Sequence, residues 1–160
     1  MRILQILFGF SGRMRRRGML LYSLLAGALF WAALFFCAFI AGLVAMRQGV
    51  DPKGAGMLVG EVFTWATSPV VIWINAALVV KRLHDIGWSG WHAAWFIPGS
   101  TVMPFYHQAV ANTALALAML VTAILVVGMA LVLIFKAGEA GDNRFGPSPK
   151  VARQAAAQPA

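Results

Sequence analysis

Two polar clusters in this chain carry the side chains whose types and spacing suit chemistry. The first runs from Lys81 to Trp91 (KRLHDIGWSGW), and the second runs from Gly138 to Pro149 (GEAGDNRFGPSP). Arginines beside a helix N-terminus bind phosphate, because guanidinium and free backbone N–H groups both donate to its oxygens. We therefore expect a lipid headgroup or a protein partner at these clusters, bound by Arg82, His84, Asp85, Ser89, Asn143 and Arg144.

The same clusters also have a purely structural interpretation. Ser89 suits the N-cap of the helix that follows it. Asp85 and Arg144 have opposite charges, and an ion pair would bring them within about 4 Å of each other. Turns, interface contacts and helix ends are then expected at Gly87, Gly90, Trp91, Pro98, Phe145, Gly146 and Pro147.

Catalysis and metal binding are disfavoured by the spacing of the reactive residues. His84 and Asp85 are adjacent, so on a helix they point about 100° apart. No serine or cysteine lies in a nucleophile motif such as GxSxG, and the three histidines lack the HExxH spacing of a zinc site. Cys37 is the only cysteine, which excludes an intramolecular disulfide and a CxxC motif. We expect no enzyme activity, no metal and no cofactor.

The composition is that of an integral membrane protein. The chain has 160 residues, of which 61% are hydrophobic and only 11% are charged. So few charges do not cover the surface of a water-soluble domain of this size. The net charge of +8 comes from basic residues placed between hydrophobic runs, as in membrane loops. We expect anionic membrane lipids as the counter-charge, and no nucleic acid.

The apolar segments predict an all-α fold, with four transmembrane helices in a small bundle. Residues 18–46 and 62–80 are uncharged, and a polar, turn-rich loop is expected at 47–56. Residues 86–135 contain no charged residue, and as one helix they would measure about 75 Å, against a hydrocarbon core of about 30 Å. The chain must turn back, and we place the break between Pro98 and Gln108. The predicted spans are 18–46, 62–80, 91–106 and 109–135.

The distribution of basic residues supports four spans over three. With four spans and both ends inside, eleven lysines and arginines lie inside and two lie outside. Three spans would place seven inside and six outside. Both termini are therefore expected in the cytoplasm.

The two ends of the chain are expected outside the bundle. Residues 1–10 predict a short interfacial helix with Ile3, Leu4, Leu7 and Phe8 facing lipid, because the basic cluster follows the apolar stretch instead of preceding it. Residues 151–160, rich in alanine and glutamine, predict a disordered tail. Residues 1–150 then form a single domain.

The second span offers an alternative function, as a small channel or transporter. Thr64, Thr67, Ser68 and Asn75 would line a path beside a kink at Pro69. The structural alternative is hydrogen bonding between helices. A coupled transporter is disfavoured, because no ionisable residue lies near the middle of a span.

The two clusters resemble those of a bacterial inner-membrane family catalogued as domain of unknown function 805. The resemblance rests on RLHDIGxSGW, on the later GxNRFGPxP and on the entry FSGRMRR at residues 10–16. This chain departs from the family pattern at Trp88, His92 and Ser148, and in a longer stretch before the second motif. The resemblance implies a small multi-pass protein of the bacterial inner membrane, without an assigned reaction. The alternative partners of such a module are another protein or further copies of this chain in a homo-oligomer.

Overall fold

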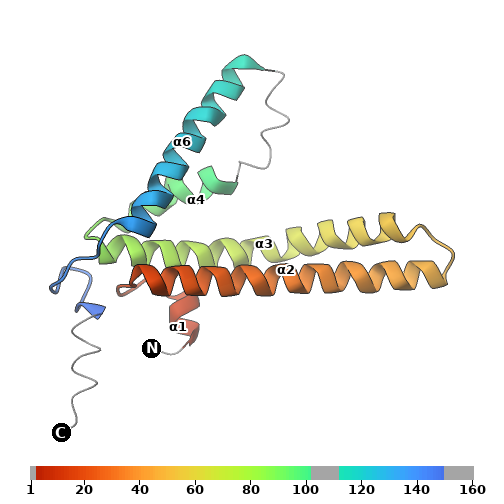
Figure 1. The fold of residues 1–160 in the computed structure, drawn as a ribbon, viewed down its shortest axis with the longest axis horizontal. Coiled ribbons are helices and arrows are strands. Elements are labelled where there is room, and N and C mark those ends of the chain that lie inside the picture. Colours follow the sequence, from red (N-terminus) through yellow and green to blue (C-terminus); the bar gives the residue numbers. More distant parts are fainter. Residues whose placement is uncertain (1–2, 102–111, 150–160) are drawn as a thin grey trace, which may run out of the picture. The chain divides into compact units, whose positions relative to one another are not determined.

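The computed structural model describes residues 3–101 and 112–149, and these residues form helices and no named strand (Figure 1). The all-helical expectation is thus confirmed for this part of the chain. The predicted tail at 151–160 lies outside it. The elements are α1 (Ile3–Phe8), α2 (Arg16–Arg47), α3 (Pro52–Asp85), the 3₁₀ turn η1 (Gly90–His92), α4 (Ala93–Thr101) and α6 (Thr113–Phe135).

Three of these helices, α2, α3 and α6, are long and apolar enough to cross a membrane. Each contains or overlaps one of the uncharged segments of the sequence. A helix needs about 20 residues to span the hydrocarbon core, and these three have 32, 34 and 23. Large apolar side chains cover their outer surfaces, among them Leu24, Trp31, Phe35 and Leu125. Such surfaces suit lipid and indicate a helical membrane protein.

The loop between α2 and α3 is shorter than expected, because α3 begins at Pro52 and not after residue 56. The Asp51 carboxylate accepts hydrogen bonds from the backbone N–H groups of Lys53 (3.1 Å) and Gly54 (2.8 Å). It therefore caps the helix, and proline fits the first helical position, where no N–H bond is needed. The prediction of a loop was therefore wrong at residues 52–56, because Asp51 and Pro52 start a helix there.

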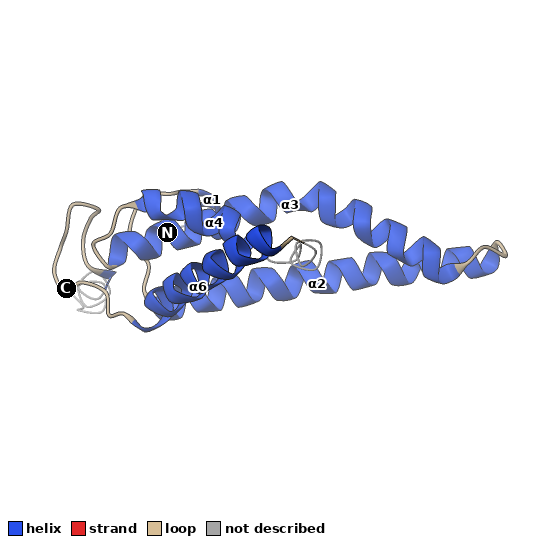
Figure 2. Cartoon of the chain, turned by 90° about the horizontal axis from the view of Figure 1, so that it is seen from above, coloured by secondary structure: helices blue, strands red, loops and turns tan. Residues whose placement is uncertain are grey.

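The chain divides into two compact units. One consists of Leu21–Ile74, which we call the hairpin, and the other combines Met1–Leu20 with Asn75–Ala160. Within the hairpin, α2 and α3 run side by side (Figures 1 and 2). The rings of Phe30 and Phe63 lie 5.8 Å apart.

In the second unit, η1 leads into α4, which packs on α6. We expected the chain to break from Pro98 onwards, but α4 continues through Pro98 to Thr101. A proline inside a helix removes one backbone hydrogen bond without necessarily ending the helix. The nine residues of α4 are too few for a membrane span, and the rest of the predicted third span, 102–106, lies outside the described residues.

Candidate functional site

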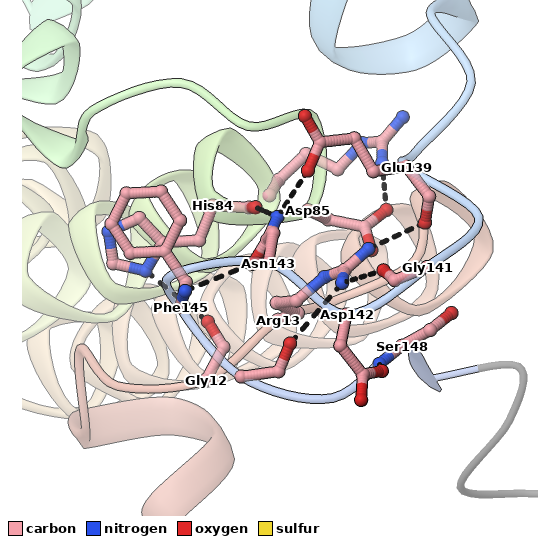
Figure 3. Close-up of polar contacts among 12 residues, drawn as sticks. Gly12, Arg13, His84, Asp85, Glu139, Gly141, Asp142, Asn143, Phe145 and Ser148 are labelled. Atoms are coloured by element: carbon pink, nitrogen blue, oxygen red, sulfur yellow. Dashed lines mark hydrogen bonds and ion pairs between the residues drawn. The ribbon is translucent and has the colours of Figure 1, made fainter.

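The polar residues of the second unit meet where the entry to α2, the end of α3 and the segment after α6 come together (Figure 3). We call Arg13, Lys81, Arg82 and Asp85 the clasp. All four are buried, with 7%, 1%, 0% and 3% of their surface exposed. A buried charge is costly unless it is paired and hydrogen-bonded, so the partners of each one matter.

Arg82 ties the end of α3 to the end of α6. Its Nη1 donates to the Asp85 carboxylate at 2.5 Å and its Nε donates to the Leu133 carbonyl at 2.9 Å. Its Nη2 donates to the Lys136 carbonyl. The last carbonyls of a helix have no hydrogen-bond donor within the helix, and the Arg82 guanidinium provides donors to two carbonyls at the end of α6. Its positive charge also balances the negative end of the α6 dipole.

Lys81 caps the end of α1 in a similar way, by donating hydrogen bonds to backbone carbonyls. Its Nζ donates to the carbonyls of Gln5 (2.7 Å) and Ile6 (2.5 Å) in the last turn of that helix. The Lys81 carbonyl in turn accepts from the Met14 backbone N–H at 3.1 Å. Two neighbouring basic residues at the end of α3 thus cap two different helices.

Arg13 binds the segment that follows α6. It donates to the carbonyls of Glu139 (2.6 Å), Gly141 (2.6 Å) and Gly146 (3.3 Å). Its Nε lies 3.4 Å from the Asp85 carboxylate. Asp85 is thus shared between two arginines, one from its own helix and one from the entry to α2.

The expected ion pair between Asp85 and Arg144 was therefore wrong in its partner. Arg13 provides the cation from outside α3, while Arg144 is exposed and lies over the Phe145 ring, at 4.7 Å from its centroid. The opposite charges were correctly recognised, but the sequence does not say which of several arginines is closest. The two predicted clusters do meet, as expected.

His84, Asn143 and Phe145 make the direct contact between the two clusters. The rings of His84 and Phe145 are stacked at 3.9 Å, and His84 Nδ1 lies 3.3 Å from the Gly12 carbonyl. The Asn143 amide donates to the His84 carbonyl at 3.0 Å and to the Glu139 carboxylate at 2.6 Å. These side chains fix the position of the NRFG turn.

The turn itself closes between Asn143 and Gly146. Their backbones exchange two hydrogen bonds, and Gly146 has a φ of +126°. Because side chains rarely adopt that φ, glycine is needed there. Pro147 follows and is exposed.

Around η1 the structural expectations fit the geometry. The Ser89 side chain caps η1 by accepting from the Trp91 N–H at 3.4 Å, and Gly87 has a φ of +78°. A Cβ on Gly90 would lie 3.0 Å from Val80. Trp91 is 83% exposed, and its place at a membrane interface stays a prediction from its residue type.

Beside the clasp lies a cavity of about 300 Å³. Arg15 lines it, and its Nε is buried without a hydrogen-bond partner in the described part of the chain. Arg16, which also donates to the Phe135 carbonyl at 3.4 Å, and Arg17 are exposed. The cavity is lined by Arg15, Arg16, Arg17, Arg82, Asp85, Ala137, Gly138, Glu139, Ser148 and Pro149.

Sequence reasoning missed the arginines before α2 as members of this site. Their crowding at positions 13–17 was visible, but it was interpreted as a sign of membrane orientation and as part of a family motif, and not as a binding site. No spacing rule connects residue 13 with residues 139–146, more than 120 positions away. In the described residues no group of histidine, cysteine and acidic side chains is placed to hold a metal ion.

The comparison with protein families gives one match. The family model described as "Protein of unknown function (DUF805)" covers residues 7–147, which include every residue of the clasp, the first polar cluster and the second polar cluster up to Pro147. No curated protein and no solved structure matches this sequence. The chain therefore belongs to the DUF805 family.

Proposed function

We propose that this chain is a non-enzymatic module of the bacterial inner membrane that binds an anionic lipid headgroup in the cavity beside the clasp. The observation that carries the proposal is the lining of that cavity. Arg15, Arg16 and Arg17 line it, and the Arg15 Nε is buried without a partner in the described residues. A buried guanidinium nitrogen gains most from an acceptor such as a phosphate oxygen.

The charge balance of the clasp supports the same function. Among the described residues, the clasp buries three cations but only one carboxylate, that of Asp85, and Asp85 pairs with only two of these cations, Arg13 and Arg82. Backbone carbonyls offset part of this excess but carry no net charge. An anion in the neighbouring cavity would reduce the repulsion that remains.

The binding residues proposed from the sequence change accordingly. Arg82 has its donors bound to Asp85 and to two carbonyls of the α6 end. We assign it to holding the site together and assign the phosphate to the arginines at the start of α2. Arg144 and Asn143 lie in the turn that closes against the clasp, outside the cavity lining.

The α2 terminus reinforces this choice. The first turn of α2 contains no acidic residue, although acidic side chains are favoured there because they offset the positive end of the helix dipole. Basic residues stand in their place, so an external anion is the natural counter-charge.

Four membrane crossings with both ends in the cytoplasm complete the proposal. Arg13 contacts Glu139 and Gly141, so the entry to α2 and the segment after α6 lie together. Since α3 also ends at the clasp, the chain between α3 and α6 must pass to the other side if α6 is to return. The span expected from the sequence at residues 91–106 would make that crossing, and the excess of basic residues favours the cytoplasm for the clasp side.

The lipid retained by the purified protein tests the function. Native mass spectrometry of the full chain, released from its own membrane in mild detergent, should show a bound anionic phospholipid. The double variant Arg15→Gln and Arg17→Gln should lose it. The matched control, Arg47→Gln with Lys53→Gln, removes two positive charges from the end of α2 and the start of α3 in the hairpin, and it should retain the lipid. Equal retention in both double variants, or a bare wild-type chain, would overturn the proposal.

A further inference from the structure

We infer that the cavity beside the clasp selects a dianionic phosphate ligand over a monoanionic one. This inference rests on the proposed function and specifies the class of ligand. Four arginines line the cavity, against the two carboxylates of Asp85 and Glu139. The lining therefore has a surplus of two positive charges, which a single phosphodiester does not neutralise.

The two carboxylates are already committed to other partners. Asp85 is paired with Arg82 at 2.5 Å and with Arg13 at 3.4 Å. The Glu139 carboxylate accepts from the Asn143 amide at 2.6 Å. In the described residues, neither carboxylate forms an ion pair with any of the three arginines at the start of α2.

These three arginines differ in how firmly they are held. Arg16 reaches the Phe135 carbonyl at 3.4 Å. Arg15 is half-buried, and its Nε lacks a partner in the described residues. Arg17 is exposed at the rim. Arg15 and Arg17 thus have N–H donors available for a ligand. A guanidinium group binds phosphate most strongly when it donates two hydrogen bonds to two phosphate oxygens.

The size of the cavity agrees with this ligand class. Its volume of about 300 Å³ is at the lower end of the range of small-molecule pockets. It suits a phosphate-bearing headgroup better than a peptide segment. Lipids offer the required charge in two forms, two phosphodiesters in one headgroup or one phosphomonoester, which carries about −1.5 to −2 at pH 7.

A lipid titration at matched charge tests the inference. The delipidated full-length chain in neutral detergent is titrated with cardiolipin, phosphatidic acid, phosphatidylglycerol or phosphatidylcholine, and binding is followed by native mass spectrometry. Phosphatidylglycerol is supplied at twice the molar amount of cardiolipin, so that total charge is equal. We expect cardiolipin, phosphatidic acid or both to bind about tenfold more tightly than phosphatidylglycerol. Inorganic pyrophosphate, added as a soluble competitor, shows whether the phosphate alone is sufficient.

Two variants with opposite expected effects on binding distinguish a change at the site from loss of the folded structure, because unfolding would only weaken binding. Arg15→Gln should weaken dianion binding about tenfold and so reduce the preference. Glu139→Gln removes one negative charge, keeps an acceptor for Asn143, and should strengthen binding of every anionic lipid. Arg47→Gln, at the end of α2 in the hairpin, should change neither the preference nor the affinity.

The outcomes separate this inference from the proposed function. If phosphatidylglycerol binds as tightly as the dianions and Arg15→Gln weakens it, the lipid site stands and the dianion preference is overturned. If no anionic lipid binds more tightly than phosphatidylcholine, or if binding ignores both cavity variants, the lipid site itself is overturned. A dianion preference that disappears in Arg15→Gln supports both.

Discussion

The hairpin and the second unit, which contains the clasp and which we call the clasp unit, are both built from helices, but different kinds of contact hold them together. In the hairpin, the described contacts between α2 and α3 are apolar, such as the ring pair of Phe30 and Phe63. The hydroxyl groups of Thr64, Thr67 and Ser68 bond within their own helix, as Thr64 does to the Gly60 carbonyl at 2.8 Å. In the clasp unit, charged side chains reach carbonyls more than 50 positions away.

This difference follows from the solvent that each region is suited to. In lipid there is little hydrophobic force between helices, because the lipid tails are as apolar as the side chains. The association of two helices in lipid then depends on the packing of small and aromatic side chains. At the end of a span, helix termini leave carbonyls without donors, and buried arginine and lysine can satisfy several at once. The clasp thus fixes which segments meet, which apolar helix surfaces alone do not specify.

The largest effect is expected at the centre of the clasp. Asp85→Asn removes the one carboxylate shared by Arg13 and Arg82. It should lower the free energy of unfolding by about 3–5 kcal/mol, because two buried guanidinium groups lose their counter-charge. Unfolding of the purified chain in mixed detergent, followed by circular dichroism, measures this. In the hairpin, Glu61→Gln changes an exposed carboxylate and should leave stability unaltered; equal losses for both variants would contradict the comparison.

A smaller loss is expected when the backbone is crowded beside the clasp. A Cβ on Gly138 would overlap the Asp85 carboxylate. That carboxylate is held by two arginines and has little freedom to move. Gly138→Ala should therefore cost about 1–3 kcal/mol, the usual range for overpacking. The same unfolding measurement applies, and a neutral result would mean that the clasp yields more easily than its contacts indicate.

Within the hairpin, the most sensitive contact is expected to be aromatic. Phe63→Leu removes the ring that lies 5.8 Å from Phe30, at an interplanar angle of 43°. The expected cost is about 1 kcal/mol, the value of an aromatic pair. Lipid retention should be unchanged, because the contact lies outside the clasp unit. Loss of bound lipid in this variant would show that the two regions are coupled.

The smallest effect is expected at a glycine with open surroundings. A Cβ on Gly27 in α2 would meet nothing within 4 Å in the described structure. Gly27→Ala should change the unfolding free energy by less than about 1 kcal/mol, in the stabilising direction, because alanine favours the helix. Gly27→Ala reports the effect of helix propensity without crowding, whereas Gly138→Ala reports the effect of crowding. A loss as large as that of Gly138→Ala would mean that something covers this face of α2.

Much of the helical arrangement could be predicted from composition and spacing. The uncharged runs predict long helices, and α2, α3 and α6 contain or overlap three of them. The start of α3 was misplaced because Asp51 and Pro52 were interpreted as turn residues, although the same pair also caps a helix. The path through Pro98 was misplaced for a similar reason, since one proline is compatible with a continuing helix.

The candidate site was only half predictable. Arg82, His84, Asp85 and Asn143 were recognised as polar residues in two clusters that should meet, and they do meet. Arg13 and Lys81 were not recognised as clasp residues. Both bind backbone carbonyls, and a carbonyl is present at every position of the chain, so no side-chain pattern reveals which ones are bound.

The sequence by itself determined that this chain is helical and apolar, and which segments carry its charges. Those properties depend on local composition, which lipid and helix geometry convert directly into long helices. Only the tertiary structure decided which arginines share Asp85 and which line the cavity. Five arginines lie within residues 1–17, and they have the same chemistry. Their roles separate only when the fold brings one of them to the carboxylate and places others around an open volume.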